Sequence, residues 1–130
     1  MQGVGRIAAP LEPETSQHLT PVFCLRYLGS GYTLKDCEEA EATRFVSKLA
    51  SLCQLKWSDI NSSPKGGMGH EKMPKDQIRA PLPARITEDV SFLLVFRFGG
   101  PEAARIIGFR KDRVFEVYAI DPKGSAYDHD

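Results

Sequence analysis

The sequence predicts an α+β domain in which one main helix, at about residues 37–56, packs on a three- to four-stranded antiparallel sheet. Two observations lead to this fold class. Apolar residues recur every three or four positions in the middle of the chain, and three β-rich runs follow one another closely in its last third. With 130 residues the chain is long enough for one domain and too short for two.

The N-terminal region divides at residue 20. Residues 1–20 combine glycines and prolines with no apolar periodicity, so we expect a flexible tail followed by a single domain over 21–130. The run VFCLRYL at 22–28 is rich in residues that favour strands and ends at a Gly-Ser-Gly turn. It predicts an N-terminal strand.

The main helix has a start signal and an apolar stripe. Asp36 and Glu39 have the spacing of a capping box, and acidic residues fill the first turn, where the helix dipole favours negative charge. The apolar positions behind them form one stripe: Ala42, Phe45, Val46, Leu49, Leu52 and Cys53. A short second helical turn is expected at 57–60.

Residues 61–84 predict a long irregular loop, because prolines and glycines interrupt every short apolar run. Loops of this length are uncommon in compact domains and often carry function, so this loop is the first place to look for a site. The alternative is a surface excursion that packs only on itself.

The last third of the chain predicts an antiparallel meander. Its three β-rich runs, at 91–98, 105–110 and 114–120, are separated by short turn sequences. A short run at 126–129 would add a fourth strand at the edge of this sheet.

Composition excludes several classes of protein. The 17 Lys and Arg balance 17 Asp and Glu, which argues against a surface that is basic all round for nucleic acid. Three cysteines without a CxxC pair predict reduced thiols and no zinc site. No apolar run approaches the roughly 18 residues of a membrane span, and the first residues lack the apolar core of an export signal. We expect a cytoplasmic protein with no membrane association, no metal and no cofactor.

The basic residues are concentrated in one region. Residues 61–113 hold ten Lys and Arg against six acids, whereas residues 114–130 have a net charge of −3. Alternation along the expected strands gives one sheet face four polar side chains: Arg97, Arg110, Glu116 and Tyr118. The alternative use of these residues is in cross-strand ion pairs on a solvated face.

Such a set has the chemistry of a phosphodiester site. Arginines hold phosphate oxygens, and a tyrosine such as Tyr118 stacks on a base. The loop would add further cations for substrate binding: Lys72, Lys75 and Arg79.

Two histidines are candidates for proton transfer near neutral pH. His129 follows Tyr127 by two residues at the end of the chain, and the alternative for this pair is a frayed terminus. His70 lies inside the loop, in the sequence GHEKMPK, and has the same two interpretations.

The sequence RIIGFRKDRVFEVYAIDPKGSAYDHD at 105–130 resembles the closing strands of the small RelE/HigB-like toxins of bacterial toxin–antitoxin modules. The resemblance covers roughly residues 85–130. Toxins of this family place one or two helices before an antiparallel sheet and end near catalytic aromatic or histidine residues. The wider pattern from PVFCLRYL to YDHD is similar to a group of small bacterial and phage proteins.

The resemblance implies a ribonuclease in which a 2′-hydroxyl of messenger RNA attacks its own phosphate. Arg97 and Arg110 would then stabilise charge, and Tyr118 or Tyr127, together with His129, would act in stacking and proton transfer. The partners would be RNA or the ribosome, and a cognate antitoxin.

Two other classes stay open. A non-catalytic protein of a phage or mobile element would bind and inhibit a host or defence protein through the 61–84 loop or the acidic C-terminal segment. A small-molecule binder would use a pocket between the helix and the sheet.

Overall fold

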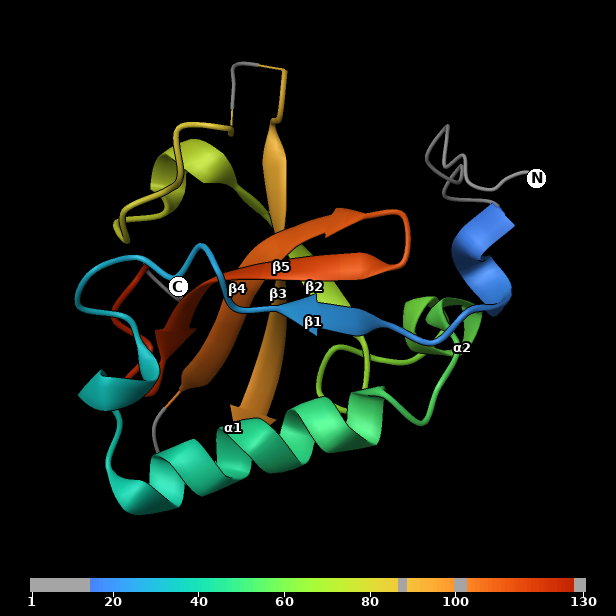
Figure 1. Ribbon diagram of the computed structural model, residues 1–130, viewed down its shortest axis with the longest axis horizontal. Helices are drawn as coiled ribbons and strands as arrows, with labels where there is room; N and C mark the ends of the chain where they lie inside the picture. Colours follow the sequence, from blue (N-terminus) through green and yellow to red (C-terminus); the bar gives the residue numbers. More distant parts are fainter. Residues whose placement is uncertain (1–14, 87–88, 100–102, 128–130) are drawn as a thin grey trace.

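The computed structural model describes residues 15–86, 89–99 and 103–127, and its centre is a five-stranded sheet in the order β1-β5-β4-β3-β2 (Figure 1). The strands are β1 (Val22–Cys24), β2 (His70–Pro74), β3 (Phe92–Gly99), β4 (Ala104–Lys111) and β5 (Val114–Asp121). The helices are α1 (Glu39–Leu52) and α2 (Trp57–Asn61), with 3-10 turns η1 (Thr15–His18), η2 (Leu34–Asp36) and η3 (Lys75–Gln77). The expected α+β class with one main helix is confirmed.

The expected sheet is wrong in strand number and in direction. Strands β3, β4 and β5 form the predicted antiparallel meander, but β1 pairs in parallel with β5, Val22 opposite Val114, so the sheet is mixed. Strand β2 lies inside the segment expected to be an irregular loop and pairs antiparallel with β3. Its sequence HEKMP carries two charges and a proline, a composition that a sheet edge tolerates but that hides a strand from sequence patterns. The expected strand at 126–129 is absent at 126–127, and 128–129 lie outside the described residues.

Helix α1 is shorter than the expected 37–56, and its capping residues differ from the expected pair. Asp36 Oδ2 accepts a hydrogen bond from the Thr33 N–H at 2.9 Å and thereby closes η2. Glu41 Oε1 accepts from the Glu38 N–H at 2.8 Å at the true start of α1. Tight turns over residues 51–55 end the helix before α2 begins. Among the described residues, no helix is long and apolar enough to cross a membrane.

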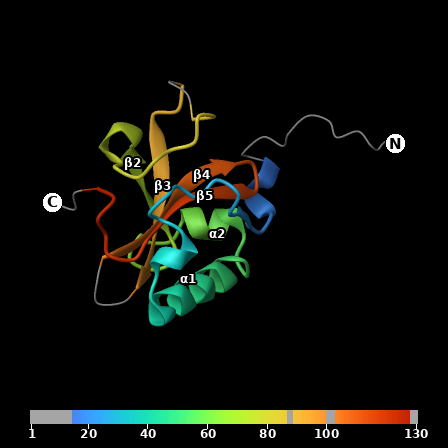
Figure 2. The ribbon, with the colours of Figure 1, turned by 60° about the vertical axis from the view of Figure 1, so that its left-hand side comes forward.

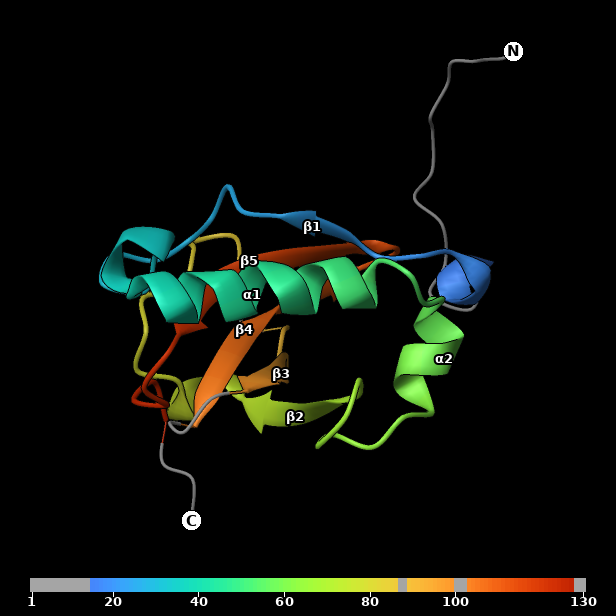
Figure 3. The same ribbon diagram turned by 90° about the horizontal axis from the view of Figure 1, so that it is seen from below.

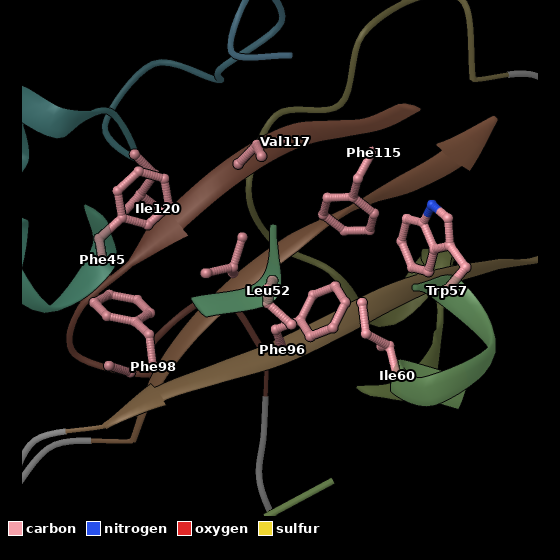
Figure 4. Packing of buried hydrophobic residues seen from close by; sticks show 11 residues of the cluster. Phe45, Leu52, Trp57, Ile60, Phe96, Phe98, Phe115, Val117 and Ile120 are labelled. Carbon is pink, nitrogen blue, oxygen red and sulfur yellow. The ribbon is translucent and has the colours of Figure 1, made fainter. Parts of the chain in front are cut away.

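Helices α1 and α2 cover one face of the sheet (Figure 3). Their buried side chains are Phe45, Leu52, Trp57 and Ile60, which pack on Phe96, Phe98, Ile106, Phe115, Val117 and Ile120 of the sheet (Figure 4). We call this cluster the first core. Its rings meet edge to face, with 5.2 Å between the centroids of Phe96 and Phe115. The stripe on α1 is narrower than expected, because Val46 is 55% exposed.

The opposite face of the sheet is covered by chain without helices. Figure 2 shows the segment 78–86, in yellow, on the side of the sheet away from α1. The buried side chains of this second core include Ala80, Leu93, Val95, Ile107, Tyr118, Ala119, Ala126 and Tyr127. The sheet is therefore largely apolar on both faces, and the buried Glu116 of the interior strand β5 is an exception.

A β-bulge breaks the alternation in β5. Ile107 pairs with Ala119 and Gly108 pairs with Val117, so Tyr118 is an extra residue on β5. A Cβ atom at Gly108 would lie 2.7 Å from a ring carbon of Phe115, so only glycine fits here. Because of the bulge, Ala119 lies with Tyr118 in the second core, whereas simple alternation predicted opposite faces.

Residues 15–20, which the sequence analysis assigned to the tail, lie against the domain. Ser16 is fully buried. The Arg113 side chain donates to Thr20 twice, from Nε to the carbonyl oxygen and from Nη2 to Oγ1, both at 3.0 Å. The rest of the expected tail, residues 1–14, lies outside the described residues.

An ion pair joins α1 to the end of the sheet and predicts a pH dependence of stability. Lys123 Nζ donates to Glu41 Oε2 at 2.7 Å, and the hydrogen bonds from Lys123 and from the Glu38 N–H lower the pKa of Glu41 below its ordinary 4.5. A lowered carboxyl pKa contributes stability that is present above pH 4.5 and is lost as the pH falls through the folded-state pKa.

We therefore expect Glu41→Gln to lower the urea midpoint of unfolding at pH 7. The difference from the wild type should shrink as the pH is lowered below 4.5. The matched control is Glu39→Gln, an exposed carboxyl in the same turn of α1. Equal urea midpoints for Glu41→Gln and wild type at pH 7 would show that the ion pair adds nothing to the stability of the fold.

Candidate functional site

The structure separates the two arginines that were expected to act together. Arg97 alternates with first-core residues of β3 and pairs with Arg105 of β4, so its side chain points to the second-core face. Arg110 pairs with Phe115, and its guanidinium carbon lies 4.2 Å from the centroid of the Trp57 ring in the first core. The two arginines lie on opposite faces of the sheet and do not form one site.

Tyr118, expected to stack on a base, is fully buried. Its hydroxyl donates to Glu116 Oε1 at 2.8 Å, and Arg85 Nη1 lies 3.4 Å from Glu116 Oε2. Burial and the hydrogen bond to Glu116 raise the pKa of Tyr118, so the phenol stays protonated. This network ties the segment around Arg85 to the sheet, and it leaves the Tyr118 ring no surface on which a base could stack.

Arg79 and Tyr127 hold the C-terminal segment in place. Arg79 Nη1 donates to the Ser125 carbonyl at 2.8 Å. Tyr127 is buried, and its hydroxyl accepts from Arg105 Nε at 3.2 Å. These contacts show how both side chains pack. Neither residue lines the groove around His70 that also contains Lys72 and Arg110.

Lys75 does not line the groove around His70 either, and His129 cannot be placed. Lys75 lines a neighbouring depression at the end of β2, which shares Val90, Ser91 and Phe92 with the groove. His129 lies outside the described residues, so the expected pairing of Tyr127 with His129 stays a prediction.

Two of the predicted residues, Lys72 and Arg110, do meet, and His70 lies with them. All three line a groove of about 610 Å³ where α2, β2, β3 and β4 come together. The other lining residues are Asn61, Asp89, Val90, Ser91, Phe92, Leu94 and Phe109. We call this site the His70 groove. Two cations and an imidazole face one carboxylate there, which favours an anionic ligand.

The His70 ring is fixed by neighbours on both sides. Its Nε2 lies 3.0 Å from Asn61 Oδ1, and Asn61 Nδ2 donates to Gln17 Oε1 at 3.2 Å. The edge of the ring meets Phe96, with 5.4 Å between centroids. In the tautomer in which Nε2–H donates to Asn61, Nδ1 keeps its lone pair and is the basic nitrogen.

The surroundings of His70 keep it neutral. Partial burial is the largest cause, and the positive charges of Arg110 and Lys72 act in the same direction. They outweigh a hydrogen bond with the His70 backbone that favours the protonated form, so the pKa of His70 falls below its ordinary 6.5. A neutral imidazole at pH 7 can accept a proton from a substrate hydroxyl.

The guanidinium of Arg110 is held in a fixed position. Its Nε donates to the Asp112 carbonyl at 2.6 Å, and its Nη2 donates to Ser16 Oγ at 2.9 Å, while the group stacks on Trp57. Asp112 has a φ of 58°, which turns its carbonyl toward this arginine in the tight β4–β5 connection. Arg110 therefore supplies a positive charge whose place is set before any ligand binds.

Phe92 gives the groove an aromatic wall. Its side chain is 50% exposed at the start of β3, and Lys72 Nζ lies 6.0 Å from its ring centroid. An exposed ring beside a cation is a surface on which an unpaired base can stack.

His70 and Lys72 were each predicted from the sequence as separate candidates, whereas Asn61 and Phe92 were not predicted. One signal in the sequence could have shown that His70 and Lys72 lie together. In a strand, residues two apart share a face, so reading HEKMP as β2 would have placed His70 and Lys72 side by side. No sequence pattern pointed to Asn61, because its role depends on α2 lying beside β2.

No group of three or more His, Cys, Asp or Glu side chains within the described ranges is arranged to hold a metal ion. The chain was also compared with models of known protein families, with curated proteins and with solved structures, and none of the three comparisons finds a match.

Proposed function

We propose that the protein is a ribonuclease that cleaves RNA at the His70 groove by attack of a 2′-hydroxyl on the adjacent phosphate. One observation carries this proposal. An imidazole with a lowered pKa lines the same groove as the cations Arg110 and Lys72, and the groove has an exposed aromatic wall. These are the groups that transfer of a phosphodiester needs: a base, charge stabilisation and a surface for the nucleobase.

The reaction follows from the position of these groups. The base stacks on Phe92, and the scissile phosphate lies near Arg110 and Lys72, whose charges stabilise the negative charge that grows on its oxygens. His70 takes the proton of the 2′-hydroxyl as the O2′–P bond forms and the P–O5′ bond breaks. His70 then returns this proton to the departing 5′-oxygen. The products are a 2′,3′-cyclic phosphate and a 5′-hydroxyl end.

The order of elements also supports the proposal. Two helices precede the antiparallel strands β3, β4 and β5, which is the order that the resemblance to RelE/HigB-like toxins implies. This similarity concerns the order of elements alone, and the chemistry follows from the residues of the groove.

The test is incubation of the purified protein with a single-stranded RNA oligonucleotide and with the same sequence made entirely of 2′-deoxynucleotides. We expect cleavage of the RNA with 2′,3′-cyclic phosphate ends, detected by mass spectrometry, and no cleavage of the DNA. Equal cleavage of both strands would exclude attack by the 2′-hydroxyl.

RNA that stays intact would also contradict the proposal. If the protein then forms a stable stoichiometric complex with a host protein, and loses it when the 61–84 segment is altered, the inhibitor interpretation is the better one.

A further inference from the structure

A second concave site lies at the other end of the β3–β4 ladder. It has a volume of about 410 Å³ and lies where the C-terminal half of α1, the glycine loop before β2, the end of β3 and the start of β4 meet. Its lining residues are Lys48, Gly66, Gly67, Arg97, Phe98, Gly99, Ala104 and Arg105. We call it the cationic cleft. It shares no lining residue with the His70 groove.

The cleft carries three positive charges from three elements. They come from Lys48 on α1, Arg97 on β3 and Arg105 on β4, and no described residue that lines the cleft bears a carboxylate. Among the described residues, the carboxylate that contacts them is that of Glu71, whose Oε1 lies 4.0 Å from Arg97 Nε. Glu71 is shared with Lys65, at 3.7 Å. The excess of cations attracts an anion.

Within the described residues, the Arg97 guanidinium is paired with Glu71 but has no hydrogen bond at Nε. Its Nε is buried and has no hydrogen-bond partner among the described residues. Turning this group toward a bound anion would therefore break no hydrogen bond at Nε, and it would relieve an unsatisfied buried donor. The side chain is 38% exposed, so its outer nitrogens can reach a ligand.

The rest of the cleft is built on fixed groups. Lys48 Nζ donates to the Gly67 carbonyl at 2.7 Å and so ties the glycine loop to α1. Arg105 Nε donates to the Tyr127 hydroxyl at 3.2 Å, which sets the direction of its side chain. Gly66 brings the loop backbone close to Arg97, since a Cβ there would lie 3.8 Å from Nη1. An anion would meet two fixed cations and one that can turn.

The cleft and the groove lie along the same strand. Leu94 lines the groove and Phe98 lines the cleft, four residues further along β3, which corresponds to about 13 Å. Arg97 points to the opposite face of the sheet from Arg110, so a strand of RNA whose scissile phosphate lies in the groove would reach the cleft by passing around the β2 edge of the sheet.

We propose that the cationic cleft binds a backbone phosphate of the same RNA strand, a few nucleotides from the scissile bond. This inference rests on the proposed ribonuclease function. It predicts that Arg97, Lys48 and Arg105 contribute to the binding of long RNA and contribute nothing to the cleavage of a dinucleotide, which fills only the groove.

The experiment measures binding of an uncleavable 2′-O-methyl oligonucleotide by fluorescence anisotropy at several salt concentrations. We expect Arg97→Met and Lys48→Met each to weaken binding about tenfold. Each variant should also reduce the slope of log affinity against log salt by about 0.7, the value for one lost contact to a single strand. The matched control is Lys111→Met, because Lys111 is exposed and lies six residues from Arg105 along β4, roughly 20 Å away.

Several outcomes decide the matter. Losses no larger than that of Lys111→Met, in variants with wild-type thermal melts, would overturn the proposal. So would an equal loss in kcat/KM on a dinucleotide, because it would place Arg97 at the reacting phosphate. If inorganic phosphate alone binds with the same dependence on Arg97 and RNA does not, the cleft is a site for a free anion and the RNA proposal is wrong.

Because binding and cleavage are measured separately, this inference can fail independently of the proposed function. Oligonucleotide binding that depends on Arg97, in a protein that cleaves no RNA, would support the cleft and contradict the ribonuclease. Cleavage of RNA by a protein whose oligonucleotide binding does not depend on Arg97 would support the ribonuclease and contradict the cleft.

Discussion

Replacing His70 by glutamine is expected to lower the rate of RNA cleavage by about 10²- to 10⁴-fold, the usual contribution of a positioned acid-base group. Glutamine keeps a polar group near the position of Nε2, which lies 3.0 Å from Asn61 Oδ1, but it cannot take up a proton at neutral pH. The measurement is kcat/KM on a labelled oligonucleotide, with affinity for the 2′-O-methyl analogue determined in parallel.

The matched control is His18→Gln, which removes an exposed imidazole from η1. It should leave the cleavage rate within a factor of two or so of wild type, as expected for a side chain outside the reacting groups. A folded His70→Gln protein that cleaves RNA at the wild-type rate would remove His70 from the mechanism.

The pKa of His70 also sets the acid side of the pH profile of kcat/KM for RNA cleavage. Because burial and the charges of Arg110 and Lys72 lower the pKa of His70 below 6.5, the base stays unprotonated in mildly acidic solution. The acid limb of kcat/KM in the free enzyme should therefore have its midpoint below pH 6.5 and should be missing in His70→Gln. A midpoint above 6.5 would contradict this environment for the imidazole.

Replacing Trp57 by alanine is expected to reduce the free energy of unfolding by about 3–5 kcal/mol, the range for large aromatic side chains in a core. Trp57 is fully buried, and its ring lies 6.3 Å from that of Phe115. Its Nε1 donates to the Arg113 carbonyl at 3.0 Å. Alanine removes this hydrogen bond and leaves a cavity between α2 and the sheet. The measurement is the urea midpoint with the slope of the transition.

Trp57→Phe separates the two effects. It keeps most of the ring and loses the hydrogen bond, so it should cost about 1 kcal/mol, plus a small term for lost volume. Because Arg110 stacks on Trp57 at 4.2 Å, cleavage should fall in Trp57→Phe even where the protein is fully folded. An alanine variant with an unchanged midpoint would show that the α2 contact is not part of the cooperative core.

How far the sequence could predict the site is shown by the three residues of the groove. Arg110 and Lys72 were recognised as cations for phosphate, and His70 as a group for proton transfer, from their chemistry alone. Their meeting was not predictable, because it depends on β2 pairing with β3, where His70 lies opposite Phe96. The register of β3 against β4, in which Arg97 pairs with Arg105, explains why Arg97, which has the same chemistry as Arg110, lies elsewhere.

The sequence by itself determined the main helix and the β3–β5 meander. In both, the spacing of apolar residues such as Phe45 and Leu52 matches the period of the element, so local pattern and final structure agree. It also determined that basic side chains would be concentrated between residues 61 and 113.

Only the tertiary structure decided the parallel pairing of β1, the strand character of β2 and the face to which each arginine points. Strand pairing joins residues far apart in the chain, and its register has no local signature. One bulge residue, Tyr118, changes which side chains share a face. Arg97 and Arg110 were therefore separated by register, and the groove and the cleft came from contacts between elements that no short stretch of sequence contains.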